Sequence, residues 1–566
     1  MKNYCDGGEA ILEGFRALGV DHIISSPGSE WAPVWEALAR QKTGNRPGPD
    51  FIDCWHETLA VDMALGYTQI TGRMQAVLLH AGAGLLQGAV GIHAATLAEM
   101  PMLIMSGESL SFGENREFDP GSQWYRNLSI VGGPQRLVEP IVKWASQAAS
   151  AYTLHDHVIR AGELAQRQPM GPTYLTAPVE AMLQQWTAPD RPRKAPPAPK
   201  TEAPAADIEK VAGLLIGAKN PVISTATAGR DPEAVAALVA LADLLAIPVI
   251  EGRACAYANF PKDHPLHLGA NIDTFLDDTD LVLAVSSRVP WYPPGNRPRK
   301  ATVVAVDRNP LKGNMVYQNL QADLYLEGDV ATSLRQLTEA VRAAGIRADK
   351  YDERRQRWRR EHDKLRERQY AAEAAAQTKR PIDPLWLSGA LRATMPPDAI
   401  YVDETVMHNN MLVDHLPWHE PQSYFCVHGG GLGQGLGVAL GIKLAAPQRP
   451  VVALMGDGSF LYNPIIQALG ASRGHKLPLL IVVFNNNKYR AMQQNHLDYY
   501  PDGAAASAGL FHGVHIDGPD YAELGRPFGF DGQKVEDPAE LKSALANGLA
   551  AVRNGKTSIL NVVLSQ

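Results

Sequence analysis

Short, largely apolar runs alternate with longer amphipathic or Ala- and Leu-rich stretches along most of this chain. The runs before residue 310 are four to six residues long and are bounded by turn-forming residues. They lie at residues 76–79, 101–105, 220–224, 247–250, 280–285 and 302–307. Runs of this length predict buried strands, and the stretches between them are long enough for helices. This alternation predicts an α/β fold with parallel sheets.

Two further apolar runs, at 451–455 and 479–484, end in polar motifs. Gly-Asp-Gly-Ser at 456–459 follows the first run, and the Asn pair at 485–486 begins 28 residues after the aspartate. The segment between the runs is long enough for one crossover helix. Both motifs are therefore expected at the carboxyl ends of parallel strands, where open α/β sheets bind ligands. A carboxylate and an amide oxygen there suit Mg²⁺, and the glycines let a diphosphate approach the backbone. An isolated Gly-Asp-Gly would also be explained as a simple turn.

Composition shifts divide the chain. Residues 187–204 are rich in proline and predict a semi-rigid linker, whereas the charged run at 351–376 predicts a solvated surface helix with both signs at i,i+4 spacing. We therefore predict three doubly wound parallel-sheet domains, at 1–186, 205–345 and 380–566.

The bulk properties exclude several classes of protein. The chain has 566 residues and a formal net charge of −7, which argues against a nucleic-acid partner. It contains no uncharged apolar stretch of about 18 residues, so no membrane span is expected. Its first residues lack an apolar signal core. The four cysteines lie far apart and match neither a disulfide framework nor a zinc spacing. A cytoplasmic protein with reduced thiols is the prediction.

The first domain carries His56-Glu57, Gly66-Tyr67 and Thr71-Gly72. This series resembles the pyrimidine-binding segment of the thiamine diphosphate-dependent 2-oxo acid decarboxylase and acetolactate synthase family. The resemblance implies three domains of the pyruvate decarboxylase type and makes Glu57 the catalytic, cofactor-binding glutamate. Such a carboxyl group shares a proton with the aminopyrimidine ring, so a raised pKa in a dry site would help. The alternative is that Glu57 is an ordinary helix N-terminal acid.

The same resemblance assigns the diphosphate end of the cofactor. It makes Asp457, Asn486 and the backbone carbonyl of Lys488 the Mg²⁺ ligands, and Leu432 the bulky side chain that bends the cofactor. Further cofactor-binding residues lie around these positions. They are Glu404, Thr405, His408, Gly456, Gly458, Ser459 and Tyr489.

Within the family, the resemblance to the benzoylformate decarboxylases extends over most of the chain. It rests on the loop Ser26-Pro27-Gly28-Ser29 and on Leu79-His80, where acetolactate synthases usually carry Ser or Thr without the histidine. The resemblance implies that Ser29 binds the substrate carboxylate or carbonyl and that His80 transfers protons, for which an imidazole is suited at neutral pH. A satisfied core histidine is the alternative for His80.

Three departures from that pattern bear on the substrate. The stretch 289–295 lacks the second active-site histidine that benzoylformate decarboxylases carry in a central-domain loop. Arg490 stands where the family usually has glycine, and either an anionic substrate or a surface salt bridge would account for it. His428, just before the glycines at 429–431, is a candidate replacement acid.

We therefore predict Mg²⁺-dependent decarboxylation of a 2-oxo acid to an aldehyde. The alternative is a carboligase of the acetolactate synthase or acyloin-forming type, which joins the product to a second carbonyl. The presence of Glu57, Asp457 and Asn486 argues against an inactive subunit. Neither Gly-rich stretch completes a dinucleotide fingerprint, which argues against a nicotinamide enzyme.

The resemblance also implies an oligomer. Family members place the cofactor between the first domain of one subunit and the third domain of another. A homo-oligomer is therefore expected. It is at least a dimer, and two such dimers would form a tetramer. Some relatives hold FAD in the central domain, and this sequence offers no support for it. The sequence does not identify the physiological substrate.

Overall fold

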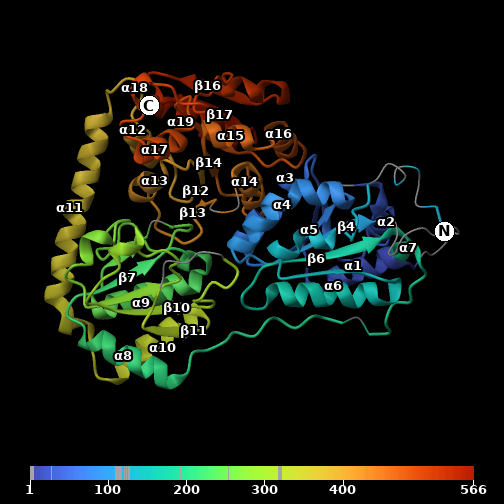
Figure 1. Cartoon of the computed structure of the whole chain (residues 1–566), viewed down its shortest axis with the longest axis horizontal. Coiled ribbons are helices and arrows are strands. Elements are labelled where there is room, and N and C mark those ends of the chain that lie inside the picture. The colour runs from blue at the N-terminus through green and yellow to red at the C-terminus, as the bar shows by residue number, and fades with distance from the viewer. Residues whose placement is uncertain are drawn as a thin grey trace. The chain divides into compact units, whose positions relative to one another are not determined.

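The computed structural model describes residues 5–26, 28–108, 118–119, 122, 124, 128–191, 193–252, 254–315, 321–427, 429 and 431–565. Three parallel sheets with helices packed on them make up this part of the chain (Figure 1). The predicted α/β fold with three parallel-sheet domains is therefore confirmed. Among the described residues, no helix is both long enough and apolar enough to cross a membrane.

The first sheet has the strand order β2-β1-β3-β4-β6-β5. Its strands are β1 (His22–Ser25), β2 (Asp50–Asp53), β3 (Gln75–Leu79), β4 (Met102–Glu108), β5 (Trp144–Gln147) and β6 (Pro172–Pro178). The helices of this region are α1 (Gly7–Leu18), α2 (Ala32–Thr43), α3 (Glu57–Thr71), α4 (Ala81–Leu97), α5 (Gln135–Val138), α6 (Ala151–Gln166) and α7 (Val179–Leu183).

The second sheet has five strands in the order β11-β10-β9-β7-β8. They are β7 (Pro221–Thr225), β8 (Val249–Glu251), β9 (Leu281–Val285), β10 (Thr302–Asp307) and β11 (Leu324–Glu327). The accompanying helices are α8 (Ala205–Gly217), α9 (Pro232–Leu245) and α10 (Val330–Ala343).

The third sheet repeats the strand permutation of the first, with the order β13-β12-β14-β15-β17-β16. Its strands are β12 (Ile400–Glu404), β13 (Tyr424–Cys426), β14 (Val451–Gly456), β15 (Leu480–Asn485), β16 (Asp531–Val535) and β17 (Ser558–Val563). Its helices are α12 (Pro384–Thr394), α13 (Asn409–His415), α14 (Gly435–Ala445), α15 (Asp457–Tyr462), α16 (Ile465–Gly474), α17 (Arg490–Tyr499), α18 (Ala504–Ala508) and α19 (Leu541–Arg553). Two helices, α15 and α16, join β14 to β15 where the sequence predicted one.

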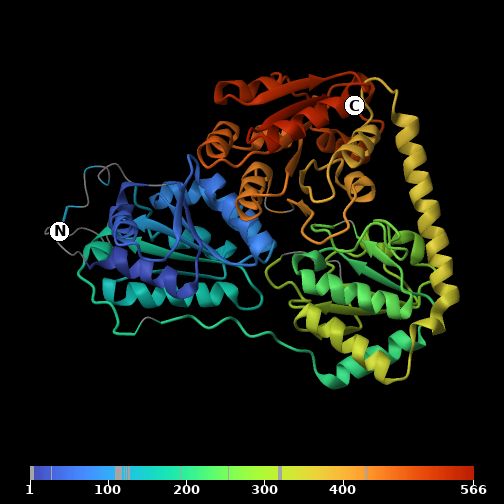
Figure 2. The same cartoon turned by 180° about the vertical axis from the view of Figure 1, so that it is seen from behind.

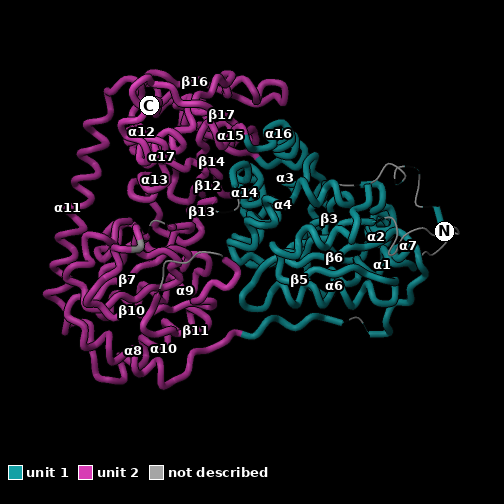
Figure 3. Tube along the Cα trace, viewed as in Figure 1, with its two compact units in different colours: residues 1–199, 428–447, 462–477 teal, residues 200–427, 448–461, 478–566 magenta. Residues whose placement is uncertain are grey.

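The described chain falls into two compact units (Figure 3). Unit 1 comprises residues 1–199, 428–447 and 462–477, and unit 2 comprises the rest. Helices α14 and α16 thus belong with the first sheet although the sequence places them in the third domain. The reason is close packing of α14 on α3: a Cβ on Gly66 would lie 2.1 Å from the carbonyl oxygen of Val438, and one on Gly441 would lie 2.0 Å from that of Met63.

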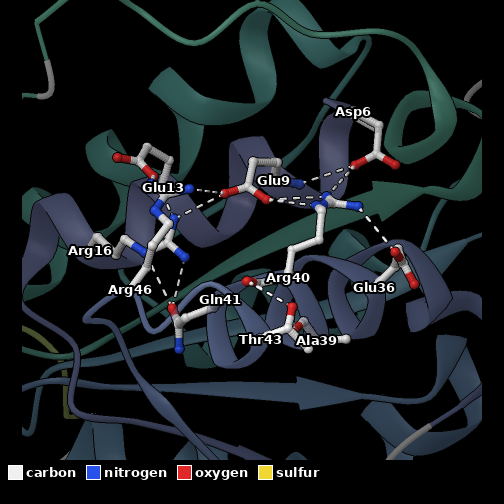
Figure 4. A network of polar contacts seen from close by, with 10 residues as sticks. All are labelled: Asp6, Glu9, Glu13, Arg16, Glu36, Ala39, Arg40, Gln41, Thr43 and Arg46. Carbon is white, nitrogen blue, oxygen red and sulfur yellow. Dashed lines mark hydrogen bonds and ion pairs between the residues drawn. The ribbon is translucent and has the colours of Figure 1, made fainter. Parts of the chain in front are cut away.

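In unit 1, a network of charged side chains joins α1 to α2 (Figure 4). Glu9 receives ion pairs from Arg16 at 3.1 Å, Arg40 at 3.1 Å and Arg46 at 3.2 Å. Arg16 also pairs with Glu13 at 2.6 Å. Because the Glu9 side chain is largely buried, these arginines offset the cost of removing its charge from water. The network thereby fixes α2, the helix that follows the loop containing Ser29.

In unit 2, helix α11 (Asp352–Ala376) runs beside both sheets (Figures 1 and 2). The sequence predicted a solvated surface helix, but one side of it is buried. Trp358 packs into the core of the second sheet, and Glu373 pairs with His415 at 2.8 Å and with Arg392. The helix therefore connects the second and third sheets.

A fully buried triad of a lysine, a glutamate and a histidine lies in the same unit. The Lys262 Nζ is 2.6 Å from Glu251 Oε2, and His267 Nε2 is 3.0 Å from the same oxygen. Although burial raises it, the Lys262 ammonium and the His267 ring bring the pKa of Glu251 down to about 2. Lys262 also lies 4.0 Å from the Trp418 ring centroid, and its backbone N–H donates to the Trp418 carbonyl at 2.9 Å. The triad thus anchors the loop after β8 to the segment before β13.

Replacing Lys262 by Met is expected to lower the free energy of unfolding by about 3–5 kcal/mol, because the Glu251 charge would remain buried without its cation. Urea denaturation followed by tryptophan fluorescence measures the change. Lys210→Met on the exposed side of α8 is the matched control, with an effect of no more than about 0.5 kcal/mol. Equal unfolding midpoints for the two variants would show that the triad adds nothing to stability.

Candidate active site

The order of strands in the first and third sheets gives each of them a topological switch point. The chain order reverses between β1 and β3, and again between β12 and β14, so the loops after these strands separate at their carboxyl ends. The loop with Ser29 follows β1, and His80 follows β3. In the third sheet, Thr405 follows β12 and Asp457 follows β14. These four sequence-predicted residues therefore lie just after the strands that flank the two switch points.

His80 is held by a buried carboxylate that the sequence analysis missed. Its Nδ1 lies 2.9 Å from Oε2 of Glu30, whose side chain is 0% exposed. The Glu30 Oε1 also accepts the backbone N–H of Ala81 at 2.8 Å. The hydrogen bond to Glu30 raises the pKa of His80 against the effect of burial, and the nearby Glu57 charge adds to the rise. The histidine is thus fixed in orientation and favoured in its protonated form.

Two glycines make room for this pair. A Cβ on Gly107, in β4, would lie 2.1 Å from Cγ of Glu30, and a Cβ on Gly28 would lie 1.9 Å from Nδ1 of His80. The signal that could have revealed Glu30 is its position beside Ser29, at the end of the strand that neighbours β3. That signal depends on the pairing of β1 with β3, which the sequence does not give.

Glu57 begins α3 and lies beside His80. The His56 side chain caps the helix by accepting the backbone N–H of Thr58 at 3.2 Å. Its ring nitrogen is therefore used in capping and not in a role next to Glu57. A Cβ on Gly84 would lie 3.0 Å from Oε1 of Glu57 and 3.3 Å from Cβ of His80. A side chain at this position of α4 would press on both residues, so Glu57 and His80 lie against the same turn of α4. Unit 1 therefore brings together Glu57, His80 and the loop of Ser29.

Leu432 also belongs to unit 1 and is half-buried. It lies between Gly431, with φ 148°, and Gly433, with φ 98°, which are conformations that other residues rarely adopt. A Cβ on Gly433 would lie 2.5 Å from the Tyr462 carbonyl oxygen. The two glycines thus present one apolar side chain from a backbone that bends sharply on both sides of it.

Asp457, in unit 2, is buried at the start of α15. Its Oδ1 accepts the backbone N–H of Gly458 at 2.9 Å, whereas Oδ2 has no hydrogen-bond partner among the described residues. Burial raises the pKa of Asp457, and the backbone N–H groups of Gly458 and of residues 486–488 oppose this rise. A buried carboxylate oxygen without a partner is costly unless something else binds it.

The loop after β15 lies against Asp457. Asn485 Nδ2 donates to Asn561 at 2.9 Å, and Asn486 Oδ1 accepts the Lys488 backbone N–H at 3.0 Å, which shapes the turn. The Tyr489 ring covers Gly458, where a Cβ would lie 2.5 Å from Cε1 of Tyr489. The predicted residues of this loop and of the Gly-Asp-Gly-Ser motif, including the buried Ser459, are therefore brought together.

The loop after β12 completes this edge. Gly456 is close to it, since a Cβ there would lie 3.5 Å from the Thr405 carbonyl oxygen. Thr405 Oγ1 and His408 Nδ1 are buried and have no hydrogen-bond partner in the described part of the chain. Burial lowers the pKa of His408 to about 4, so this ring is neutral. Glu404, the last residue of β12, is buried as well.

A polar cluster that the sequence analysis did not identify holds this loop in place. Asp403 Oδ1 accepts the Thr405 backbone N–H at 2.8 Å. Its Oδ2 accepts the Tyr424 hydroxyl at 2.8 Å and the Asn409 amide at 3.0 Å. All of these groups are buried, and the cluster satisfies their hydrogen bonds internally. It does not involve Thr405 Oγ1 or His408 Nδ1, which have no partner among the described residues.

The residues present fit a diphosphate and its metal ion. Three buried polar atoms at one sheet edge lack partners among the described residues, namely Asp457 Oδ2, Thr405 Oγ1 and His408 Nδ1. Asp457 and Asn486 offer the carboxylate and amide oxygens that Mg²⁺ prefers. Within the described ranges no group of three or more His, Cys, Asp or Glu side chains could hold a metal. The predicted Mg²⁺ ligands do not form such a group, because Asp457 is the one carboxylate among them.

The remaining sequence predictions have different outcomes. Arg490 is the first residue of α17 and makes no ion pair with any described residue, so the salt-bridge explanation for it is not supported. Its charge contributes to the lowered pKa of His408, after the larger effect of burial. His428 lies outside the described residues, as do Pro27 and Gly430.

Models of one protein family match three successive parts of the chain. The N-terminal TPP binding domain of thiamine pyrophosphate enzymes matches residues 5–119, their central domain matches 208–337, and their C-terminal TPP binding domain matches 405–562.

Individual relatives are similar along the whole chain. Benzoylformate decarboxylase of Pseudomonas aeruginosa is 27% identical over 557 residues, which is 96% of each chain. Acetolactate synthase isozyme 3 large subunit of Escherichia coli is 25% identical over 587 residues, or 99% of this chain and 94% of the relative. The solved structure of a thiamine diphosphate-dependent 4-hydroxybenzoylformate decarboxylase from Rhodococcus jostii RHA1 has a TM-score of 0.78 at 22% identity and covers 99% of both chains, which shows a common fold.

The matched domains follow one another along the chain, and the third of them carries the sheet edge where three buried polar atoms lack partners among the described residues. The chain belongs to the thiamine pyrophosphate enzyme family.

Proposed function

We propose that the protein is a thiamine diphosphate- and Mg²⁺-dependent decarboxylase that converts a 2-oxo acid to an aldehyde. The observation that carries the choice of decarboxylase is the His80–Glu30 pair beside Glu57. A protonated, oriented imidazole at this place can deliver the proton that turns the decarboxylated species into an aldehyde. The 27% identity to a benzoylformate decarboxylase supports the same choice.

In this proposal each domain has one task. Residues 1–186 bind the pyrimidine through Glu57, residues 205–345 form the central domain, and residues 380–566 bind the diphosphate. Asp457, Asn486 and the Lys488 carbonyl hold Mg²⁺. The bound cofactor supplies the electron sink that accepts the pair released with CO₂. Leu432 supports its bent form, and the other cofactor contacts come from Glu404, Thr405, His408, Gly456, Gly458, Ser459 and Tyr489.

The substrate end of the site is proposed to belong to Ser29 and His80. Ser29 is exposed and adjoins Glu30, which places it next to the His80–Glu30 pair. His80 stays protonated to a higher pH than a free imidazole because Glu30 hydrogen-bonds to it. Glu30 acts through His80 and is therefore a positioning residue.

A second copy of the chain is part of the proposal. Large apolar side chains lie exposed on and next to α3 and α4, namely Trp55 at 61%, Leu86 at 57% and Val90 at 40%. Exposed apolar side chains gathered around a site are typical of a protein–protein interface. We infer a homo-oligomer, with the dimer as its minimum. The tetrameric state and the cytoplasmic location stay predictions from the sequence.

Carboligation is the second candidate. The 25% identity to an acetolactate synthase favours it, as does the absence of a histidine at 289–295, because slower protonation leaves time for a second carbonyl to react. Product analysis separates the two functions. The protein is reconstituted with thiamine diphosphate and Mg²⁺ and given aliphatic and aromatic 2-oxo acids, alone and with aldehyde acceptors. Aldehyde as the main product supports a decarboxylase, whereas acyloin or acetohydroxy acid as the main product identifies a carboligase.

Glu30→Gln is expected to lower kcat about tenfold or more, since positioned proton transfer contributes at least that much. It should also move the alkaline limb of the pH–rate profile. Glu30 raises the pKa of His80, so its loss lowers that pKa, and the protonated histidine disappears at a lower pH than in the parent. Steady-state rates from acid to alkaline pH measure both effects.

Glu36→Gln, an exposed acid on the neighbouring helix α2, is the matched control and should leave kcat and the limb unchanged. If Glu30→Gln slows the reaction but its alkaline limb stays in place, Glu30 acts on something other than the protonation of His80.

A further inference from the structure

A cavity of about 370 Å³ lies in unit 2 beside the middle of α11. It is lined by five basic side chains from four segments of the chain and by a single acid, Asp263. The basic residues are Lys262, His362, Arg366, Arg392 and His419. Its remaining wall contains Met395 and three prolines, which are rigid and offer an apolar surface. A cavity with this lining attracts anions.

The acids that balance two of these cations lie outside the lining. Lys262 pairs with Glu251 at 2.6 Å, and Arg392 pairs with Glu373, but neither glutamate lines the cavity. Asp263, which does line it, pairs with His419 at 3.1 Å. Lys262 and Arg392 therefore line the cavity while the glutamates that pair with them do not.

Arg366 is paired with no carboxylate among the residues that the structure describes. Its Nη1 donates to the Gln369 amide oxygen at 2.9 Å, and its Nη2 donates to the Tyr370 hydroxyl at 2.9 Å. Both partners are neutral, and no ion pair joins Arg366 to any other described residue. Arg392 is also incompletely satisfied, because its buried Nε has no acceptor in the described part of the chain.

The two guanidinium groups are held next to one aromatic ring. Arg366 lies 4.9 Å and Arg392 4.3 Å from the centroid of Tyr370. Two like charges against the same ring repel each other, and an anion between or beside them would relieve that repulsion. His362 is fixed as well, since its Nδ1 is 2.8 Å from the His267 carbonyl oxygen. The cationic side of the cavity is thus preorganised.

We propose that this cavity binds a small phosphorylated molecule. Its phosphate group is held by Arg366, Arg392 and His419, and its organic part lies on Met395 and the prolines at 396, 397 and 417. A phosphate group suits this lining better than a carboxylate does, because its three terminal oxygens accept hydrogen bonds from several guanidinium and imidazole donors at once.

The site is separate from the proposed thiamine diphosphate site. Pro396 and Pro397 precede β12 and so lie at its amino end, whereas Thr405 and His408 follow β12 at its carboxyl end. The two groups of residues therefore belong to opposite edges of the third sheet. The inference accordingly goes beyond the proposed function and does not depend on it.

Calorimetric titration of the holoenzyme tests the proposal. The protein is first saturated with thiamine diphosphate and Mg²⁺, so that the diphosphate end of that site is not open to the probes. Phenyl phosphate and inorganic phosphate are then titrated separately. We expect one phenyl phosphate to bind per chain, more tightly than inorganic phosphate does, because of the apolar wall.

Arg366→Gln should weaken phenyl phosphate binding at least about tenfold, since it removes a charge-assisted hydrogen bond. Its partners are neutral, so its melting temperature should match that of the parent. Arg360→Gln, an exposed arginine on the same helix, is the control and should bind as the parent does. The proposal is overturned if the parent binds neither probe, if it binds inorganic phosphate only, or if Arg366→Gln binds phenyl phosphate as tightly as Arg360→Gln.

Discussion

Replacing Glu57 by Gln is expected to lower kcat about a thousandfold, within the range that positioned acid–base groups contribute. The amide keeps the size of the side chain and its place at the start of α3, but it cannot share a proton with the pyrimidine ring. The loss should arise before the substrate reacts. Exchange of the reactive thiazolium C–H for deuterium, followed by NMR after acid quenching of the holoenzyme, should slow by a similar factor.

Thiamine diphosphate affinity separates this loss of activity from a loss of binding. In Glu57→Gln it should change by less than the rate does, because the diphosphate and metal contacts are elsewhere. Glu139→Gln, an exposed acid of the same domain, is the matched control and should behave as the parent. Parental turnover in Glu57→Gln would remove Glu57 from the mechanism.

Asp457→Asn is expected to weaken thiamine diphosphate binding at a fixed Mg²⁺ concentration by about 100-fold or more, since even residues that only support a metal ligand contribute 10–100-fold. Chelation of Mg²⁺ from the parent should have an equal or larger effect. The physical reason is the buried Oδ2 of Asp457, which has no partner among the described residues and is left for the metal ion. Calorimetric titration of the apoprotein with thiamine diphosphate measures the effect of the substitution and the effect of removing Mg²⁺.

The stability of the apoprotein distinguishes a binding role from a structural one. Burial raises the pKa of Asp457, which means that its charge is unfavourable in the folded chain. The neutral amide that replaces this carboxylate in Asp457→Asn should therefore leave the melting temperature of the apoprotein unchanged or raise it. Asp502→Asn, an exposed acid of the same unit, is the control for both measurements. A lower melting temperature with unchanged cofactor affinity would identify Asp457 as a structural residue.

Much of the fold could be predicted from the chain alone. The apolar runs at 302–307 and 451–455 coincide with β10 and β14 to within a residue, because strands buried on both faces need continuous apolar sequence. The motifs at strand ends could be located for the same reason. Asp457 and Asn486 follow β14 and β15, and these strands are neighbours.

What the sequence did not reveal depends on which strands and helices become neighbours. Glu30 is recognisable as the partner of His80 only once β1 is known to pair with β3. The Asp403 cluster requires β12 beside β13. The packing of α14 on α3 follows from glycines on both helices, and no local pattern distinguishes these glycines from those of turns. Arg366 likewise looks like any other arginine of a charged helix until its neutral partners are seen.

The yield of CO₂ and of aldehyde from one labelled 2-oxo acid tests the central claim most directly. Holoenzyme, apoprotein and Glu57→Gln holoenzyme are given carbon-13-labelled benzoylformate, and both products are counted by NMR. The account predicts equal amounts of CO₂ and aldehyde from the holoenzyme, about a thousandfold slower release of both from Glu57→Gln, and neither from the apoprotein beyond the uncatalysed background. No CO₂ from a holoenzyme that binds its cofactor, with this or any other 2-oxo acid, would contradict it. So would CO₂ released without aldehyde.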